Sequence, residues 1–569
     1  MSSTVPSLAP VRRSHYILIF VVMLILRGVC AFRFRVDADE PQHLHVIWGW
    51  VNGYLPYRDV FDNHGPLFHV LLAPLFRVLG ERPDILILMR FAMIPFLAIC
   101  LWCVYRVGTD LFSRNVGIWA AILTGFYPEY FLTSAEFRTD VLWTVLWLLA
   151  LVTITRQSFG KKHAFLTGLL LGGCFGVTVK TGLMVGALGP WALMAAVRTW
   201  NEGGQGIVRS LVVKALAGLG GFVMVPGAAL LFFAAQGMAR QYLYYNIGFN
   251  LIPHSQNWER FDGHVLWFPL FLLVVLVVYA FVRKRSYSAI DIQRIGLVLT
   301  AGFYFTALKT FFPTLSRQDD LPVIPLATLV VVAALFFLVD RVSSADRRRW
   351  LLTAGFPLLA AIEILVLTLK TSSWTDNMAS HTVMVADVLK ATEKHEFVMD
   401  ATGETIFRMR PFYYALEAFT KVRIERGLIV DDIAQNLIDT QTSLVRIRDL
   451  TKPATAFVRE NYLLIGHGLW MVGKKVKPTE PDSRTKIHFE TRIAARYTFL
   501  TPEAQQVMGE LDGMPFSGER LLEPGPHDFV AAEKVKDYLL LFSARGFQRG
   551  FIPVMAVSAQ AEKQADPSF

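Results

Sequence analysis

Charged residues are scarce in this chain. They make up 18% of its 569 residues, whereas 53% are apolar and 13% are aromatic. This composition excludes an ordinary soluble protein and predicts an integral membrane protein. Residues 1–370 hold 32 Lys and Arg against 20 Asp and Glu, and residues 371–569 hold 24 against 26. Basic residues of membrane proteins collect in cytoplasmic loops, so the basic excess gives no reason to expect a nucleic-acid partner.

Cysteine is also rare. The chain has four cysteines, and all of them lie in apolar stretches of the first 370 residues: Cys30, Cys100, Cys103 and Cys174. Their number and position exclude a disulfide framework and a cysteine metal site. Heptads, short-period repeats and low-complexity tracts are absent as well, which excludes coiled-coil and repeat architectures.

Long apolar runs are abundant. A membrane-spanning helix needs about 20 apolar residues, and this length predicts about eleven spans. The predicted spans are 15–32, 84–106, 114–132, 138–155, 164–179, 182–198, 211–235, 264–282, 292–312, 320–340 and 350–370. Arg12 and Arg13 precede the first span and no cleavage site follows it, so we interpret it as a retained anchor with a cytoplasmic N-terminus.

The connections between spans carry basic clusters on alternate sides. Together with Arg12 and Arg13, the predicted cytoplasmic segments 106–114, 156–162, 198–214, 283–294 and 341–349 hold 18 of the 32 basic residues of residues 1–370. The positive-inside rule supports this orientation, and an odd number of spans places the C-terminal region outside the cytoplasm. The absence of cysteines and glycosylation sequons from that region favours a bacterial inner membrane with a periplasmic C-terminal region.

The C-terminal 199 residues predict two extracytoplasmic regions. Residues 371–480 mix helix-like and short strand-like segments, which favours a small α/β domain. Residues 486–569 alternate strand-like runs with turns, which favours a β-sandwich-like module. Neither region contains a catalytic signature, so we expect the chemistry within residues 1–370.

Ionisable residues at the ends of membrane spans are costly, which makes them functional candidates. The predicted alternation puts many of them on the non-cytoplasmic face, beside a first outer loop over residues 33–66. They are Arg90, Glu136, Arg138, Asp140, Lys180, Arg317, Asp319 and Asp320. Charged side chains at the ends of spans can also extend toward the lipid headgroups only to remain solvated. This alternative explanation for the eight residues stays open.

The first outer loop carries three acids, Asp37, Asp39 and Glu40. Asp39 and Glu40 are adjacent and therefore point in different directions, so at most one of them is expected to act as a base. The pair Asp37 and Asp39 also fits a divalent cation, although three-letter acidic patterns are common. His43 and His45 have a spacing suited to zinc on a strand, but interfacial histidines explain them more simply.

Five motifs occur in a characteristic order: DEPQHLH, HGPLFHVLLAP, FRTDVLW, GVTVKTGLMVGALGPWAL and LSRQDDLPVIPLA. In this order they resemble the membrane domain of GT-C glycosyltransferases, in particular the branch that uses polyprenyl-phosphate sugars and includes protein O-mannosyltransferases and aminoarabinose transferases. The resemblance covers residues 15–340. It implies a polytopic α-helical GT-C fold and a polyprenyl-phosphate-linked sugar donor. We expect no cofactor, with a divalent cation at Asp37 and Asp39 as the alternative.

The resemblance also implies roles for individual residues. The acid pair of the first outer loop maps onto Asp39 as catalytic base, with Glu40 as its neighbour. Family members often have Lys-Pro-Pro-Leu where this chain has residues 64–67, so a phosphate-binding role for His64 is in question. The later family positions fall on Asp140, Lys180 and, more loosely, Arg317.

The chemistry of sugar transfer agrees with this assignment. Negative charge grows on the departing phosphate, and a fixed cation must stabilise it. Candidate phosphate-binding residues are Lys180, Arg317, Arg90 and His64, and Asp140, Glu136 and Arg138 are candidates for binding substrate. A carboxylate that takes the acceptor proton on the opposite face implies inversion at the anomeric carbon.

The sequence therefore predicts an inverting hexosyl- or pentosyltransferase that acts on a lipid, glycan or protein hydroxyl at the outer membrane face. Two alternatives remain. A transporter or flippase of lipid-linked sugars also has many spans, although its charges would lie near the bilayer midplane. The second alternative is a non-catalytic membrane scaffold that binds glycan through its C-terminal region.

Overall fold

The computed structural model describes residues 13–156, 158–203, 206–251, 263–284, 287–312, 316–370, 375–479 and 485–554. The chain divides into two compact units. Unit 1 comprises Met1–Arg35, Asn63–Leu71 and Ile87–Asp376, and unit 2 comprises Val36–Asp62, Leu72–Leu86 and Asn377–Phe569. Most of the first outer loop therefore belongs to the same unit as the C-terminal region.

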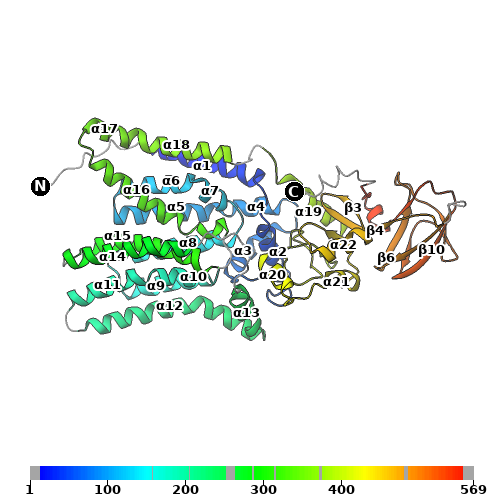
Figure 1. The fold of residues 1–569 in the computed structure, drawn as a ribbon, viewed down its shortest axis with the longest axis horizontal. Helices are drawn as coiled ribbons and strands as arrows, with labels where there is room; N and C mark the ends of the chain where they lie inside the picture. Colours follow the sequence, from blue (N-terminus) through cyan, green and yellow to red (C-terminus); the bar gives the residue numbers. More distant parts are fainter. Residues whose placement is uncertain are drawn as a thin grey trace. The chain divides into compact units, whose positions relative to one another are not determined.

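Unit 1 is helical, and its long helices run side by side (Figure 1). Its helices are α1 Arg13–Arg33, α5 Ile94–Leu111, α6 Arg114–Phe126, α7 Pro128–Thr133, α8 Thr139–Ile154, α9 Lys161–Phe175, α10 Thr181–Ala187, α11 Gly189–Glu202, α12 Ile207–Ala235, α13 Ala239–Asn246, α14 Trp267–Lys284, α15 Ala289–Phe311, α16 Ile324–Asp340, α17 Ala345–Trp350 and α18 Phe356–Lys370. Short 3₁₀ turns cover Gly248–Asn250, Gly263–Leu266 and Arg317–Asp320. Leu351–Gly355 forms a π-helical turn.

A helix, or two consecutive helices, lies at the position of each of the eleven predicted spans. Four helical segments of the described residues are long and apolar enough to cross a membrane by themselves: Ile85–Leu111, Thr181–Asn201, Ile207–Ala235 and Ala345–Lys370. Shorter apolar helices include Thr139–Ile154 and Ile324–Asp340. The number of crossings stays a prediction.

Glycines bring α9 and α12 into close contact. A Cβ atom built on Gly168 would lie 1.9 Å from the carbonyl oxygen of Gly218, and one on Gly172 would lie 2.2 Å from that of Phe222. From the other helix, a Cβ on Gly221 would lie 2.1 Å from the carbonyl oxygen of Phe165. Small residues allow such an approach, and in lipid the resulting van der Waals contact is a main source of helix association. These two helices form a tightly packed pair.

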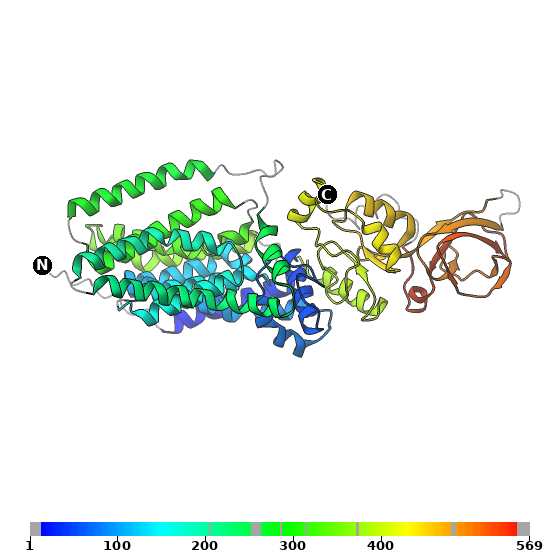
Figure 2. The same cartoon turned by 90° about the horizontal axis from the view of Figure 1, so that it is seen from below.

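Unit 2 combines helices with two sheets (Figure 2). Its helices are α2 Asp39–Val51, α19 Ala379–Ala391, α20 Ala418–Glu425, α21 Ile433–Asp439, α22 Lys452–Asn461 and α23 Ala544–Gln548. Its strands are β1 Val398–Met399, β2 Leu444–Arg446, β3 Tyr462–Gly466, β4 Leu469–Val476, β5 Lys486–Thr491, β6 Ala495–Leu500, β7 Gly509–Leu511, β8 Met514–Phe516, β9 Arg520–Leu522, β10 Gly525–Ala531 and β11 Leu539–Ser543. Helices α3 Leu67–Leu79 and α4 Ile85–Phe91 each belong partly to both units.

The C-terminal region is rich in strands, as the sequence predicts. One sheet has seven strands in the order β1-β2-β4-β11-β6-β9, with β3 also paired to β4, and a second sheet has the order β5-β10-β7-β8. Strand β1 is parallel to β2. Strand β4 pairs antiparallel with β11 through Leu539 and Val476, so one sheet extends across the predicted boundary near residue 480. The division into two C-terminal domains stays a prediction.

Candidate active site

A buried ion pair lies where α9 ends and α10 begins. The Lys180 ammonium donates to Asp319 Oδ1, although the residues are 139 positions apart in the sequence. The Asp319 side chain is 1% exposed and that of Lys180 is 18% exposed. The second Asp319 oxygen accepts from the Ser316 backbone N–H at 2.8 Å and from the Ser316 hydroxyl at 3.1 Å. Both carboxylate oxygens of Asp319 are therefore hydrogen-bonded, whereas the Lys180 side chain remains partly exposed.

A second pair lies beside the first. Arg138 Nε is 3.5 Å from Asp140 Oδ2, and both side chains are less than a tenth exposed. Asp140 also interacts electrostatically with Lys180 and His64. One turn along α8, the Trp143 indole N–H donates to the Thr181 hydroxyl at 3.0 Å and holds the start of α8 against the start of α10. We refer to Lys180, Asp319, Asp140 and Arg138 as the Lys180 cluster.

The structure adds two residues for which the sequence analysis predicts no role, Tyr304 and Lys309. Tyr304, on α15, is fully buried, and its hydroxyl has no hydrogen-bond partner among the residues that the structure describes. It lies within electrostatic range of Asp319 and Asp140. Lys309, five residues further along α15, donates to Asp320 at 3.0 Å. The doubled acid of the RQDD motif was a signal for Asp319, but a tyrosine within an apolar run carries no such signal.

Arg90 caps a helix. Its guanidinium donates to the backbone oxygens of Cys30 at 3.3 Å, Phe34 at 3.1 Å and Arg35 at 2.6 Å, at the end of α1. The Cys30 carbonyl also accepts from the Phe34 backbone N–H at 2.9 Å. Carbonyls of the last helical turn have few backbone N–H donors, and a cation at a helix C-terminus stabilises them. This arrangement gives Arg90 a structural role, and its predicted contact with a phosphate stays a prediction.

Glu136 and Arg317 make contacts outside the Lys180 cluster. Glu136 is buried, 3.6 Å from Arg35, and it accepts from the Gln318 amide at 3.5 Å. The Arg317 side chain is 69% exposed and lies 3.5 Å from Glu129. Arg317 therefore lies at the surface, and only its neighbours Gln318 and Asp319 reach inward.

The loop at residues 63–67 contacts the chain beside Lys180. Gly65 donates its backbone N–H to Val177 at 2.9 Å, and Leu67 donates to Gly176 at 3.1 Å. A Cβ on Gly65 would lie 2.1 Å from the Gly176 carbonyl oxygen, so only glycine fits here. This contact places His64, which is half-buried, within electrostatic range of Asp140.

Asp39 and Glu40 belong to unit 2, at the first turn of α2. Glu40 is fully buried and accepts from the Asp37 backbone N–H at 3.0 Å. Asp37 in turn accepts from the Asp39 N–H at 3.2 Å. Asp37 and Glu40 thus fix the start of α2, and Asp39 remains partly exposed. The joint action of Asp39 with Lys180, which belongs to unit 1, stays a prediction.

Helix α2 packs against a loop of the C-terminal region, residues 400–416. Ten of its thirteen residues are buried. Its His45 Nδ1 lies 2.8 Å from the Ile406 carbonyl oxygen, and the Thr402 hydroxyl donates to the Ala38 carbonyl just before α2. The rings of Phe61 and Tyr413 lie edge to face, with their centroids 5.8 Å apart. Residues 36–62 of the first outer loop thus belong to unit 2, and α2 lies in its core.

The contacts of His45 explain this residue without a metal. Burial lowers the pKa of its imidazole, which favours the neutral form with Nδ1–H donating to Ile406. In the described part of the chain, no three His, Cys, Asp or Glu side chains form a group that could hold a metal ion. The alternatives of a cation at Asp37 and Asp39, or zinc at His43 and His45, therefore gain no support.

Comparison with known families gives a match over part of the chain. Residues 63–240 match the model of the dolichyl-phosphate-mannose-protein mannosyltransferase family. The matched segment includes three of the four residues of the Lys180 cluster, namely Lys180, Asp140 and Arg138, whereas Asp39 and Asp319 lie outside it. No curated protein sequence matches the chain.

Solved structures share the fold at low sequence identity. ArnT from Cupriavidus metallidurans bound to undecaprenyl phosphate has a TM-score of 0.51 and 11% identity, over 76% of this chain and 92% of that chain. The same protein in the apo state has a TM-score of 0.51 and 12% identity, over 81% and 98%. The apo oligosaccharyltransferase of Archaeoglobus fulgidus has a TM-score of 0.47 and 11% identity, over 87% and 74%.

The family match rests on sequence, and the similarity to ArnT rests on the fold. The matched segment 63–240 contains three of the five motifs, HGPLFHVLLAP, FRTDVLW and GVTVKTGLMVGALGPWAL. Together they confirm that the chain resembles the GT-C glycosyltransferases that use polyprenyl-phosphate donors, and that it has the fold of ArnT.

Proposed function

We propose that the chain is an inverting glycosyltransferase that moves a monosaccharide from a polyprenyl-phosphate sugar to an acceptor hydroxyl at the outer face of a bacterial inner membrane. The observation that carries this proposal is the Lys180 cluster, which lies largely within the segment that matches the mannosyltransferase family. The binding of undecaprenyl phosphate by ArnT, which shares the fold, supports a lipid-phosphate donor.

Lys180 is the proposed ligand of the donor phosphate. An ammonium has three N–H donors, and among the described residues Asp319 is the one hydrogen-bond acceptor of the Lys180 ammonium. The remaining donors are available to a phosphate, and Asp319 keeps the ammonium in position. As the bond between the anomeric carbon and the phosphate oxygen breaks, this fixed cation stabilises the growing negative charge.

Asp39 is the proposed base. Its carboxylate takes the proton of the acceptor hydroxyl while the oxygen attacks the anomeric carbon, a contribution of roughly 10²- to 10⁴-fold to the rate. Asp37 and Glu40 hold the turn that carries Asp39, through the backbone contacts described above. A single displacement of this kind inverts the configuration at the anomeric carbon.

The test uses purified full-length protein in lipid, a panel of undecaprenyl-phosphate sugars, and the release of undecaprenyl phosphate as readout. We expect the wild type to release it from at least one donor. Asp39→Asn should abolish release, and Lys180→Gln should lower it about 10²- to 10³-fold. Asp346→Asn, an exposed acid on α17, is the matched control and should retain full activity.

Two results would contradict the proposal. Normal turnover by Asp39→Asn would remove the base assignment. If the wild type moved lipid-linked sugar across the membrane without releasing the lipid phosphate, the flippase alternative would replace the transferase.

A further inference from the structure

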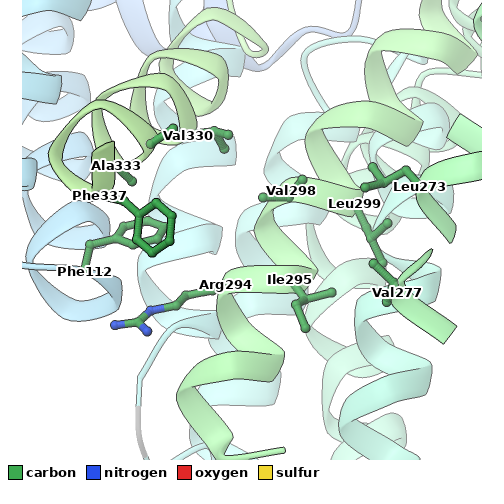
Figure 3. Close-up of a pocket in the computed structure, with 11 residues that line it drawn as sticks. Phe112, Leu273, Val277, Arg294, Ile295, Val298, Leu299, Val330, Ala333 and Phe337 are labelled. Carbon is green, nitrogen blue, oxygen red and sulfur yellow. The ribbon is translucent and has the colours of Figure 1, made fainter. Parts of the chain in front are cut away.

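A groove of about 470 Å³ lies between α14, α15 and α16 of unit 1, beside the end of α5 (Figure 3). Its lining is almost entirely apolar, with Leu273 of α14, Val298 of α15 and Val330 of α16 among the contributing side chains. Arg294 is the one charged residue among those that line it. A volume of this size falls within the range of small-molecule sites, roughly 300 to 1,000 Å³.

Arg294 marks one end of the groove. In Figure 3 its side chain extends away from Ile295 and toward the Phe112 end. Its Nε donates to the Leu111 carbonyl oxygen at 2.6 Å, its guanidinium carbon lies 5.5 Å from the Phe112 ring centre, and its Nη1 is 4.0 Å from Asp291. The backbone contact fixes this cation at the rim.

A second guanidinium lies against another aromatic residue of the lining. The Arg341 guanidinium carbon is 4.2 Å from the ring centre of Phe337, which lines the groove. Arg341 is exposed, and the described part of the chain has no carboxylate within ion-pair distance of it. The groove thus combines an apolar interior with two cations, each stacked on one of its aromatic residues.

This groove is separate from the Lys180 cluster. Lys309 pairs with Asp320, the neighbour of Asp319 in that cluster. Arg294 and Lys309 lie fifteen residues apart on α15, which corresponds to about 22 Å along a helix axis. A phosphate at Arg294 therefore cannot also occupy the Lys180 cluster. Both cations also lie on connections that the sequence predicts to be cytoplasmic, 283–294 and 341–349.

We propose that the groove binds an anionic phospholipid of the surrounding bilayer, with an acyl chain between α14 and α16 and the phosphate at Arg294 and Arg341. Basic pockets between membrane helices on the cytoplasmic side favour such headgroups, and each cation near an anionic surface strengthens the attraction. The separation from the Lys180 cluster argues against the sugar donor as the occupant.

The test counts lipids that stay bound to the full-length protein in native mass spectrometry, with dioleoylphosphatidylglycerol and dioleoylphosphatidylcholine as competing probes. We expect one retained phosphatidylglycerol. Ala333→Trp fills the groove and should lower its retention about tenfold, and Arg341→Gln should lower it about fivefold. Two control variants keep the groove intact, Ala228→Trp on the exposed face of α12 and Arg209→Gln at its start, and should change retention less than about twofold.

Three outcomes would overturn the proposal. One is equal retention of the two phospholipids by the wild type. Another is that undecaprenyl phosphate displaces phosphatidylglycerol from the wild type and does not bind the Ala333→Trp variant. The groove would then be a binding site for the lipid carrier of the sugar. The third is that the wild type forms a dimer and the Ala333→Trp variant does not. The groove would then be an interface between two copies of the chain.

Discussion

Two buried ion pairs, one in each unit, differ in how fully their cations are bonded. In unit 1 the Lys180 ammonium has one hydrogen-bond acceptor among the described residues, Asp319. In unit 2 the Arg410 guanidinium lies 3.3 Å from Asp400 and also donates to the carbonyl oxygens of Asp400, Ala401 and Tyr414, at 2.7 to 3.2 Å.

The acids of the two pairs, by contrast, are both held by backbone N–H and hydroxyl groups near them in the sequence. Asp400 accepts from the backbone N–H of Gly403 at 2.5 Å and from the N–H and hydroxyl of Thr405 at 2.7 and 2.6 Å. Asp319 has comparable contacts with Ser316. The two pairs therefore differ in their cations. The Arg410 guanidinium, which donates to several carbonyl oxygens, fixes a loop. The Lys180 ammonium, which has one acceptor among the described residues, is suited to bind a ligand. Burial and charge alone do not separate the two roles.

The largest expected effect on stability is at Arg410. Arg410→Ala leaves a buried carboxylate and three carbonyls without their cation, and should lower the free energy of unfolding of unit 2 by about 3 to 5 kcal/mol. Lys180→Gln also removes the cation from a buried carboxylate, but glutamine keeps an N–H donor and Lys180 is 18% exposed, so the cost should be lower, about 1.5 to 3 kcal/mol. The measurement is denaturant-dependent proteolysis of the full-length chain, with fragments assigned to each unit.

Asp439→Ala, at an exposed position of α21, is the control and should change stability by less than about 0.5 kcal/mol. An equal loss of stability in Arg410→Ala and Lys180→Gln would break the comparison, because the Lys180 pair would then be as structural as the other.

A smaller effect is expected at Gly403, in the loop that contacts α2. Its φ is +99°, and a Cβ there would lie 2.9 Å from His45 Cβ. At Gly468 φ is +73°, and a Cβ would meet no atom within 4 Å. Gly468→Ala should cost about 1 to 2 kcal/mol through backbone strain alone. Gly403→Ala should cost about 1 to 3 kcal/mol more through the clash.

Hydrogen exchange separates these two costs. We expect Gly403→Ala to speed the exchange of the α2 amides and Gly468→Ala to leave it unchanged. Equal exchange of α2 in both variants would mean that loop 400–416 does not hold this helix.

The smallest effect is a pH dependence at His45. Burial lowers the pKa of its imidazole from the ordinary value of 6.5, so the unfolded chain binds this proton more readily than the folded one. Stability is therefore full above pH 6.5 and falls as the pH drops through that value. His45→Asn keeps an N–H donor without a titratable group, and denaturation between pH 7.5 and 5.5 should show a shallower pH slope for it.

The apolar spans were predictable because membrane thickness sets their length, and a helix follows from length and composition alone. The closeness of Asp140, Arg138 and Lys180 could also be predicted, since charges at the ends of apolar runs are conspicuous; their roles in the reaction stay predictions. The partner of Lys180 could not be predicted from the sequence. Asp319 lies 139 positions away, and the contact between the two residues depends on helix packing.

The contact between α2 and loop 400–416 could not be predicted from the sequence, for a related reason. The loop has no periodic pattern, and the bond between His45 and Ile406 spans 361 positions. Arg90 illustrates a different limit. An arginine near the end of a span fits a phosphate ligand and a helix cap equally well, and only the positions of the α1 carbonyls identify the cap.

The sheet that crosses the predicted boundary near residue 480 has a practical consequence. Strand β4 pairs with β11 from Gly473 to Val476. A chain truncated at residue 485 would lose β11 and leave those backbone groups of β4 as an open edge, ready to pair with another molecule. Such a fragment would aggregate for reasons unrelated to its activity. Replacement of the short β7–β8 hairpin, which lies in the other sheet, is the safer way to alter this end of the protein.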